Sequence, residues 1–419
     1  MMKNMIADQA KNKFVLSILK KITSNFGATQ LTGIAVLTAG LLLSACGGGA
    51  SSSSSSPALP NNPSTGNDLP PIPTVAPTYL VAPPSGKLPF PQHAPNMTAT
   101  QYEQMRSSLW VLNNFGMYQG SDDGRSSMYL HDGLDFMLPD GSPVYAVRTG
   151  VIRDISGDII TVDDPAKPDT GWQMAHLVVD PRLKVGTQVW QGQYVGSILK
   201  GNSHTHFNYV QRSANGSWFR DTISLYPNHL FTLPDEQKPE FNSGLRYFKN
   251  ASEVEINPSQ GIYGKVDIVL AMRDLSPNHP ANYVSRSAPA KFEIRVSDLQ
   301  GQLKWQHQSQ LQNIQLTPPF LGDANTAKVE ANLLFKRPDL LETGSWTKKA
   351  YLWWVLTNLP DHAAPQKISA RDEDLSWDTT AKNSQGGAVF PNGLYSVTII
   401  ASDQNGNVGQ LQETVRINN

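Results

Sequence analysis

The sequence predicts a mainly β protein in which an antiparallel sheet domain is followed by a β-sandwich. Between Tyr129 and Val210, short apolar runs are separated by Gly, Asp and Pro, which is the spacing of an antiparallel sheet. From about residue 250, apolar and polar residues alternate with period two, as strands with one buried face require. Charged residues make up only 16% of the chain beside 32 Gly and 30 Pro, and this composition favours strands and loops over helices.

Composition also limits the classes of function. The chain has 419 residues, enough for roughly two to three domains. Its formal net charge of −1 gives no reason to expect a nucleic-acid partner. Cys46 is the only cysteine, so an internal disulfide is excluded and core packing, with or without a metal, must hold the fold.

Residues 1–45 have the layout of an export signal. Scattered lysines precede an apolar run, Leu31 to Leu43, of about 13 residues. A bilayer span takes about 20 residues, so this run is short for one. The end of the run, Leu-Ser-Ala-Cys46, resembles the lipobox of bacterial lipoproteins. An ordinary signal peptide with an incidental cysteine, or a membrane anchor, is the alternative interpretation.

The lipobox resemblance implies cleavage before Cys46 and acylation of that cysteine, and two or more acyl groups hold a chain on a membrane stably. Gly47 rather than Asp follows Cys46. In lipoproteins of this kind that implies the outer membrane, so we expect a lipid-anchored protein of the bacterial cell envelope that faces the periplasm.

Residues 46–88 are predicted to be a Ser/Pro-rich tether. A serine run, Ser51 to Ser56, is followed by closely spaced prolines, and such a segment cannot bury a core. As coil, about 40 residues span about 35 Å, and as extended polyproline they reach about 120 Å. Either length could lift a domain from a membrane toward a nearby cell wall.

The first folded domain is expected at residues 89–240, with its core at 129–210. A short helix should open it, because Thr100 and Glu103 fit a capping box and Gly116 is a natural stop. One face of this helix would carry Tyr102, Met105, Leu109 and Leu112. Strands are then expected at the apolar runs 144–147, 151–152, 159–162, 177–179 and 194–198.

Four of the nine histidines fall in this core, in three places. His131 is followed by Asp135, His176 stands in Ala-His-Leu, and His204 and His206 form His-x-His-Phe. Zinc prefers imidazole and carboxylate ligands, and catalytic sites use three of them and keep one open position. On a strand, both rings of a His-x-His pair lie on one face, so one can bind metal while the other points at a substrate. Each motif alone is common by chance.

Together, in this order, the motifs resemble the lysostaphin-type (LytM-like) zinc endopeptidases. That family has His-x-Gly-x-Asp, then Ala-His-Leu, then His-x-His-Phe. Between and before these motifs the chain also matches its glycine pattern, at Val185-Gly186, Val189, Gly192 and Gly196 and at Gly141-Ser-Pro-Val-Tyr-Ala146 and Gly150-Val-Ile152. The resemblance covers Tyr129 to Val210, roughly a fifth of the chain.

By this resemblance, His131, Asp135 and His206 would hold Zn²⁺, and His204 and His176 would flank the open position. Zinc would acidify a water, and a neutral histidine could take its proton during attack on a peptide carbonyl. Zinc and the other histidine could stabilise the oxyanion. His204 is favoured as the base, although either histidine could take either role.

Two departures from the family pattern concern neighbours of these residues. Asn208 stands where the family usually has Glu, and Met174 stands where it often has Tyr. The glycine-rich loop before His204 is shortened to residues 201–203. Because loops shape clefts, these differences bear on which bond is cut.

Residues 250–419 are predicted to form an immunoglobulin-like β-sandwich. Strands are expected at 265–270, 292–296, 351–356 and 394–401, with a turn at Asn405-Gly406. The segment from Asn392 to Asn407 resembles bacterial immunoglobulin-like domains. A sugar-binding platform is one interpretation of its tryptophans, and core packing is the favoured one; they are Trp346, Trp353, Trp354 and Trp377.

These expectations combine into a zinc metalloendopeptidase that cuts the peptide cross-links of peptidoglycan. Its partners would be peptidoglycan stem peptides, the membrane through the lipid on Cys46, and an envelope protein bound by the C-terminal domain. A non-catalytic LytM-like lipoprotein that binds the wall or activates an amidase is the main alternative. An adhesion or scaffold lipoprotein is a third, and it leaves the histidines unexplained. A cross-link between D-amino acids is the favoured bond, with a glycine bridge as the alternative.

Overall fold

In the computed structural model, the described residues are 69–119, 129–276, 278–279, 287–319, 324–336, 351–369 and 375–419. They belong to one compact unit, Leu59–Asn419. The predicted export signal, Cys46 and Trp346 lie outside them. Within the described part, no helix has the length and apolar character needed to cross a bilayer.

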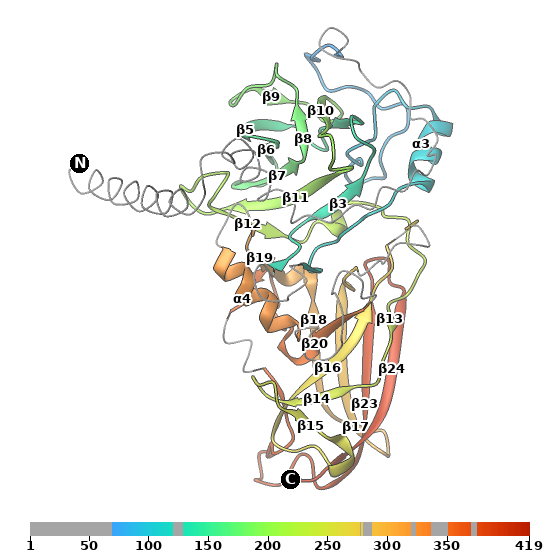
Figure 1. Ribbon diagram of the computed structural model, residues 1–419, viewed down its shortest axis with the longest axis vertical. Coiled ribbons are helices and arrows are strands. Elements are labelled where there is room, and N and C mark those ends of the chain that lie inside the picture. Colours follow the sequence, from blue (N-terminus) through green and yellow to red (C-terminus); the bar gives the residue numbers. More distant parts are fainter. Residues whose placement is uncertain are drawn as a thin grey trace, which may run out of the picture. The chain divides into compact units, whose positions relative to one another are not determined.

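Strands dominate the described chain, so the predicted fold class is confirmed (Figure 1). Every pairing of described strands is antiparallel except that of β19 with β21. The apolar runs predicted to be strands form β4, β5, β6, β8 and β10. This agreement follows because short apolar runs bounded by Gly, Asp and Pro are typical of strands.

The largest described sheet carries the histidine motifs. Its order is β21-β19-β12-β11-β7-β6-β5-β9, and β3 pairs with β11 outside this path. Its strands are β3 (Leu134–Met137), β5 (Gly150–Ser156), β6 (Ile159–Asp163), β7 (Thr170–Ala175), β9 (Gln188–Val189), β11 (His204–Arg212), β12 (Thr222–Leu225), β19 (Ile314–Leu316) and β21 (Gln366–Lys367). The last two come from the C-terminal part of the chain, so that part extends the same sheet.

Two smaller sheets complete this region. A three-stranded sheet has the order β4-β10-β8, and a two-stranded sheet pairs β1 with β2. Their strands are β1 (Tyr118–Gln119), β2 (Tyr129–Leu130), β4 (Pro143–Tyr145), β8 (Leu177–Val179) and β10 (Tyr194–Ile198). One apolar core, with Phe136, Trp172 and Phe207 at its centre, packs between the strands.

The first helix begins and ends elsewhere than predicted. Helix α3 (Ala99–Ser107) is capped by Thr98, whose backbone is extended and whose side chain forms a capping box with Gln101. The predicted box of Thr100 and Glu103 is therefore wrong, because Thr100 already lies inside the helix. Gly116 does not end the helix either. The chain leaves it after Ser107 because residues 110–113 bond to β3, for example through the Leu112 N–H and the Asp135 carbonyl at 2.8 Å.

The described end of the predicted tether contacts the first domain. Arg182 donates a hydrogen bond of 2.8 Å from Nη2 to the carbonyl of Pro70. The Leu88 N–H donates to the carbonyl of Leu230 at 2.8 Å, and Leu88 itself is buried. Residues 69–88 are thus held against the domain that carries the histidines.

The C-terminal region contains two sheets that pack face to face. One has the order β18-β17-β23-β24, and the other has β13-β16-β14-β15 with β20 and β22 also paired to β16. Their strands are β13 (Glu240–Phe241), β14 (Arg246–Lys249), β15 (Glu255–Ile256), β16 (Lys265–Arg273), β17 (Lys291–Asp298), β18 (Leu303–Gln310), β20 (Leu352–Val355), β22 (Trp377–Asp378), β23 (Gly393–Ser402) and β24 (Val408–Ile417). One core joins the two sheets, and Phe292 packs on Trp354 at 5.1 Å between ring centroids.

Trp353, Trp354 and Trp377 serve the core, as the favoured interpretation predicted, and Trp346 lies outside the described residues. Trp354 and Trp377 are fully buried and Trp353 is 7% exposed. None of these three rings can therefore form an open sugar-binding platform. The second described helix, α4 (Ala324–Leu334), buries Ala331 and Leu334 in the same core.

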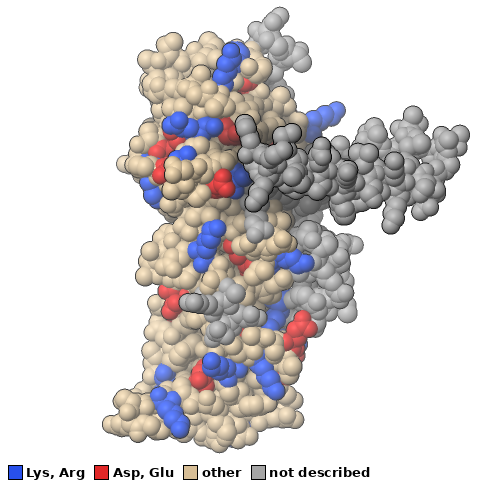
Figure 2. Space-filling view, turned by 90° about the vertical axis from the view of Figure 1, so that its left-hand side faces the viewer, with Lys and Arg blue, Asp and Glu red and all other residues tan. Residues whose placement is uncertain are grey.

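On the face shown in Figure 2, Lys and Arg side chains alternate with Asp and Glu side chains and do not gather into one large patch. Short 3₁₀ turns connect several strands; they are η1 (Asn228–Leu230), η2 (Pro258–Gln260), η3 (Leu311–Asn313) and η5 (Leu356–Asn358).

Candidate metal centre

The pairing of β3 with β11 brings the first and third histidine motifs together. In the antiparallel register, His206 lies directly opposite Asp135 and His204 lies opposite Met137. Directly opposite residues of antiparallel strands point to the same face. His131 stands just after β2, in the connection that leads into β3. The His-x-x-x-Asp spacing thus corresponds to a tight turn of the chain, which brings the ring of His131 back beside Asp135 in β3.

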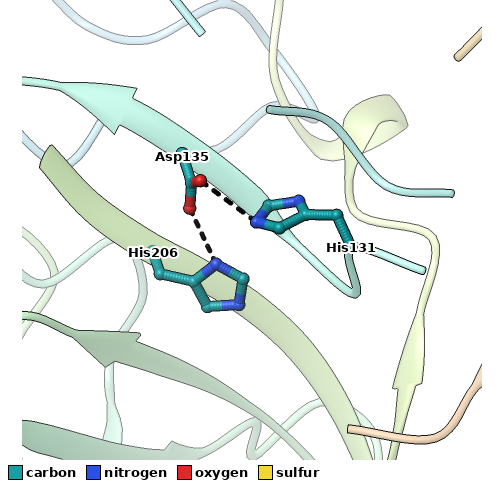
Figure 3. A group of neighbouring side chains, drawn as sticks. All are labelled: His131, Asp135 and His206. Carbon is teal, nitrogen blue, oxygen red and sulfur yellow. Dashed lines mark hydrogen bonds and ion pairs between the residues drawn. The ribbon is translucent and has the colours of Figure 1, made fainter. Parts of the chain in front are cut away.

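His131, Asp135 and His206 form a compact group (Figure 3). His131 Nε2 lies 3.1 Å from Asp135 Oδ2, and His206 Nδ1 lies 2.8 Å from Asp135 Oδ1. One ligand atom from each residue lies within 4.8 Å of the other two. The two imidazole rings meet edge to face with centroids 4.7 Å apart. His131 and Asp135 are 3% and 2% exposed, and the His206 side chain is 16% exposed, so the group is open to water mainly at His206.

Hydrogen bonds on the outer side of each imidazole fix which nitrogen faces the group. His131 Nδ1 lies 3.2 Å from the carbonyl of Asn114 and 3.1 Å from that of Gly133. A carbonyl only accepts, so this nitrogen carries the proton and Nε2 keeps its lone pair for the centre. His206 Nε2 lies 3.0 Å from Asn208 Oδ1 and leaves Nδ1 for the centre in the same way. Such outer partners orient metal-binding histidines.

The carboxylates of the site are held by further side chains. Asn113 donates from Nδ2 to Asp135 Oδ2 at 2.6 Å. Asn208 donates from Nδ2 to Asp132 Oδ2 at 2.9 Å, and Ser224 donates to the same oxygen at 2.9 Å. Asn208 departs from the family's usual Glu, and its amide links His206 to the buried Asp132.

The charge state of the group is set by its internal contacts. Burial alone would raise the pKa of Asp135, but the charges of His131 and His204 and the hydrogen bonds of His131 and His206 hold it well below its usual range. Burial alone would lower the pKa of His206, but its hydrogen bonds to Asp132 and Asp135 raise it to about 10. Asp135 is therefore charged, and without a metal His206 carries a proton toward it that a bound cation would displace.

The other two histidines pack beside this group. The rings of His176 and His204 have centroids 4.7 Å apart, and His204 Nε2 lies 3.9 Å from Asp135 Oδ1. His204 Nδ1 donates to the carbonyl of Asn202 at 2.6 Å. Its Nε2 is buried and has no hydrogen-bond partner in the described structure. Burial lowers the pKa of His204, with Asp135 opposing and His176 adding to this effect, so the neutral form is favoured.

His176 is fixed by an aspartate that the sequence analysis did not single out. Asp158 Oδ2 accepts from the backbone N–H of His176 at 3.2 Å and lies 3.3 Å from its Nδ1. The hydrogen bond from His176 lowers the pKa of Asp158, so this carboxyl is charged. His176 adopts a φ of 65°, a backbone conformation that is uncommon for residues other than glycine. Backbone of this kind is often found at functional sites.

Gly133 of the first motif is required by a close approach. A Cβ at this position would lie 2.3 Å from both the carbonyl oxygen of Phe207 and Asn208 Oδ1. Any other residue would push β11 away from the turn that holds His131. The glycine therefore allows the two halves of the metal centre to meet.

The five predicted site residues are thus brought together, and their donors fit zinc. Two imidazole nitrogens and one carboxylate oxygen make up the set found in catalytic zinc sites of the two-histidine type. Both imidazoles present the correct nitrogen, and outer partners are in place. Sequence patterns gave no signal for Asn113, Asn114 and Asp158, because backbone folding alone brings them to the site.

Of the comparisons with known proteins, the one with solved structures gives matches. No protein-family model matches the chain, and no curated protein matches it. Among solved structures, the catalytic domain of lysostaphin from Staphylococcus simulans is 25% identical, with 27% of this chain and 85% of that one covered and a TM-score of 0.22. The catalytic domain of a prophage-encoded M23 protein, EnpA, from Enterococcus faecalis is 19% identical over 29% of this chain and 91% of that one, with a TM-score of 0.22.

A putative M23 peptidase from Pseudomonas aeruginosa is 29% identical over 19% of this chain, with a TM-score of 0.17. The chain covers only 37% of that protein. TM-scores of this size do not establish a shared fold, so the function of the chain has to be argued from its own residues.

Proposed function

We propose that the chain is a zinc-dependent endopeptidase that hydrolyses the peptide cross-links of bacterial peptidoglycan. The observation that carries this proposal is the convergence of two separate motifs on one group with a zinc-type donor set, while His176 of the third motif packs against His204 beside it. A purely structural role leaves His204 unexplained, because its inward nitrogen is buried without a partner among the described residues. An acceptor nitrogen beside a metal centre is what a hydrolase needs.

His131, Asp135 and His206 would hold the metal, and zinc when bound supplies a Lewis acid that polarises a carbonyl and lowers the pKa of a water ligand. The chain's own residues supply the proton transfers. His204, neutral because of its burial, accepts the proton of the attacking water at Nε2. Asp158 accepts from His176 Nδ1, so a protonated His176 has Nε2–H free to donate to the carbonyl oxygen as that oxygen gains charge.

An extended peptide can reach this site along β8. An open and mainly apolar groove is lined by Asp158, by the strand that follows His176, and by Leu183 and Leu199. β8 ends its described sheet, and Val178 within it is 52% exposed. A free strand edge can pair with an extended peptide through main-chain hydrogen bonds. This supports a peptide substrate over a sugar one.

Digestion of purified peptidoglycan tests the proposal. The zinc-loaded full chain should release muropeptides with fewer cross-links, and mass spectrometry of the products should show a cut between D-amino acids rather than in a glycine bridge. Chelation and His204→Ala should each stop the release, whereas His229→Ala, which removes an exposed histidine outside the motifs, should not. If folded, zinc-loaded chain releases nothing, a wall-binding or amidase-activating role replaces this one.

We also propose that acylated Cys46 anchors the chain to the outer membrane, facing the periplasm. The lipobox-like sequence before Cys46 supports this. Cells fed an alkyne-labelled fatty acid should label the wild-type chain and the Ser56→Ala chain, but not the Cys46→Ser chain. An unlabelled wild-type chain, or label retained after Cys46→Ser, would contradict the anchor.

A further inference from the structure

Three aspartates from distant parts of the sequence meet in the described structure. Asp235 lies in the connection between η1 and β13. Asp274 comes directly after β16, and Asp403 comes directly after β23. One carboxylate oxygen from each lies within 4.8 Å of the other two. Asp274 and Asp403 are 4% and 3% exposed, and Asp235 is half-buried. Negative charges that lie this close together and are shielded from water repel one another strongly.

No cationic side chain of the described residues offsets this charge. Beside burial, the charges that most strongly shift the pKa of Asp235 and Asp274 are other acids. The hydrogen bonds to the carboxylates come from neutral donors. The N–H of Gln237 donates to Asp235 Oδ1 at 3.0 Å, and the N–H of Leu275 donates to Asp274 Oδ1 at 3.1 Å. These donors orient the carboxylates without neutralising them.

The carboxyl groups of Asp235 and Asp274 therefore hold protons more tightly than exposed carboxyl groups do. Burial, with Asp403 adding to it, raises the pKa of Asp235 to about 6. Burial, with Asp235 and Asp403 adding to it, raises the pKa of Asp274 well above its usual range. A bound cation would replace these protons.

A second, independent observation points to a cation. The three carboxylates line a cavity of about 20 Å³, which has room for about one water-sized particle. Asn228 lines the same cavity and is only 4% exposed, yet its Oδ1 accepts no hydrogen bond from a described residue. Gln404 Oε1 is another buried oxygen on this cavity without such a partner. Oxygen acceptors that surround a small cavity need a hydrogen-bond donor or a cation between them, and the like charges of the three carboxylates favour the cation.

We infer that Asp235, Asp274 and Asp403 bind one calcium ion, with Asn228 providing a further oxygen. The donor set contains oxygen alone, which hard cations prefer over zinc. Magnesium is usually held by one or two carboxylates together with waters, whereas calcium takes more oxygen ligands from the protein itself. Three carboxylates in one group therefore fit calcium better.

A second hairpin in the same sandwich shows which part of the arrangement is ordinary turn structure. Asp403 Oδ1 accepts from the N–H groups of Asn405 and Asn407, at 2.8 and 2.9 Å. Asp298 is the last residue of β17, and its Oδ1 accepts from the residues two and four positions later in the same pattern. Asp298, however, pairs with Lys304. The turn itself therefore needs no calcium, and Asp298 is a matched control for Asp403.

The proposed ion would lie where the sandwich supports the metal centre. Val111 and Asn114 line the same cavity. Asn114 exchanges two hydrogen bonds with the backbone of Ala288, at 2.8 and 2.7 Å, and its carbonyl faces His131 Nδ1. Calcium would thus stabilise the segment that orients His131.

Calcium titration and thermal unfolding of the full chain test this inference. The starting buffer contains zinc but no calcium, so that only the calcium concentration changes. Calcium should bind one ion per chain and raise Tm by roughly 5 °C or more when well above its Kd, and magnesium should raise it less. Asp298→Asn should respond as the wild type does.

Asp274→Asn removes one charge and mimics the protonated carboxyl, so this variant should fold. Without calcium its Tm should equal or exceed that of the wild type, and calcium should no longer raise it. A wild-type chain that neither binds calcium nor changes its Tm, or an Asp274→Asn chain that responds as the wild type does, would overturn the inference. Neither readout depends on peptidase activity, so the outcome is separate from that of the proposed function.

Discussion

Asp135→Asn is expected to weaken zinc binding by more than about 100-fold and to abolish hydrolysis at physiological zinc. Changes to outer partners of a metal ligand typically cost 10–100-fold in affinity, and the loss of a charged ligand should cost more. Asn113 Nδ2 donates a hydrogen bond to Asp135 Oδ2, so in Asp135→Asn the new amide oxygen would take the position of Oδ2. Its NH₂ group would then face His206 Nδ1, 2.8 Å away, and bind the lone pair that His206 needs for metal.

The control for this variant is Asp169→Asn. Asp169 is an exposed carboxylate that pairs with Arg212, and its φ of 57° suits asparagine. Zinc content by elemental mass spectrometry and the rate of peptide hydrolysis should both stay at wild-type values in this control. If Asp135→Asn keeps one zinc per chain and its activity, Asp135 is not a ligand.

His204→Ala is expected to lower kcat by about 10²- to 10⁴-fold while zinc content stays at one per chain, because general acid–base groups contribute factors of this size. His204 is not among the three ligand residues, and its Nδ1 contacts only the carbonyl of Asn202 among described residues. Its buried Nε2, 3.9 Å from Asp135 Oδ1, is placed to accept a proton.

His176→Ala separates the two histidine roles. If His204 is the base, its removal should eliminate the acidic limb of the pH–rate profile, while removal of His176 should lower the rate and leave that limb in place. The reverse result would assign the base to His176. A His204→Ala chain with wild-type kcat would remove proton acceptance at this site from the mechanism.

The sequence predicted the site residues better than it predicted the site's surroundings. His131, Asp135 and the His-x-His pair could be found because their spacing follows from strand geometry: alternate residues share a face, and a close turn returns His131 to Asp135. Asn113 and Asp158 could not be found, since their roles depend on how residues 110–113 bond to β3 and how the β5–β6 turn reaches His176.

The same distinction holds for the fold. Short apolar runs between turn residues located β5 and β6. Alternation located β17 and β23, because burial of one face imposes that pattern. The addition of β19 and β21 to the large sheet could not be predicted from these short segments. The meeting of three aspartates was equally hidden, because Asp235, Asp274 and Asp403 share no motif and are joined only by the tertiary fold.

Zinc titration into chelator-stripped full chain, followed by hydrolysis of a purified cross-linked muropeptide dimer, tests the central claim most directly. The metal centre described above predicts that hydrolysis starts from zero, rises in proportion to added zinc and reaches a plateau at one zinc per chain. Hydrolysis that is independent of zinc, or its absence from folded chain that has bound one zinc, would contradict it.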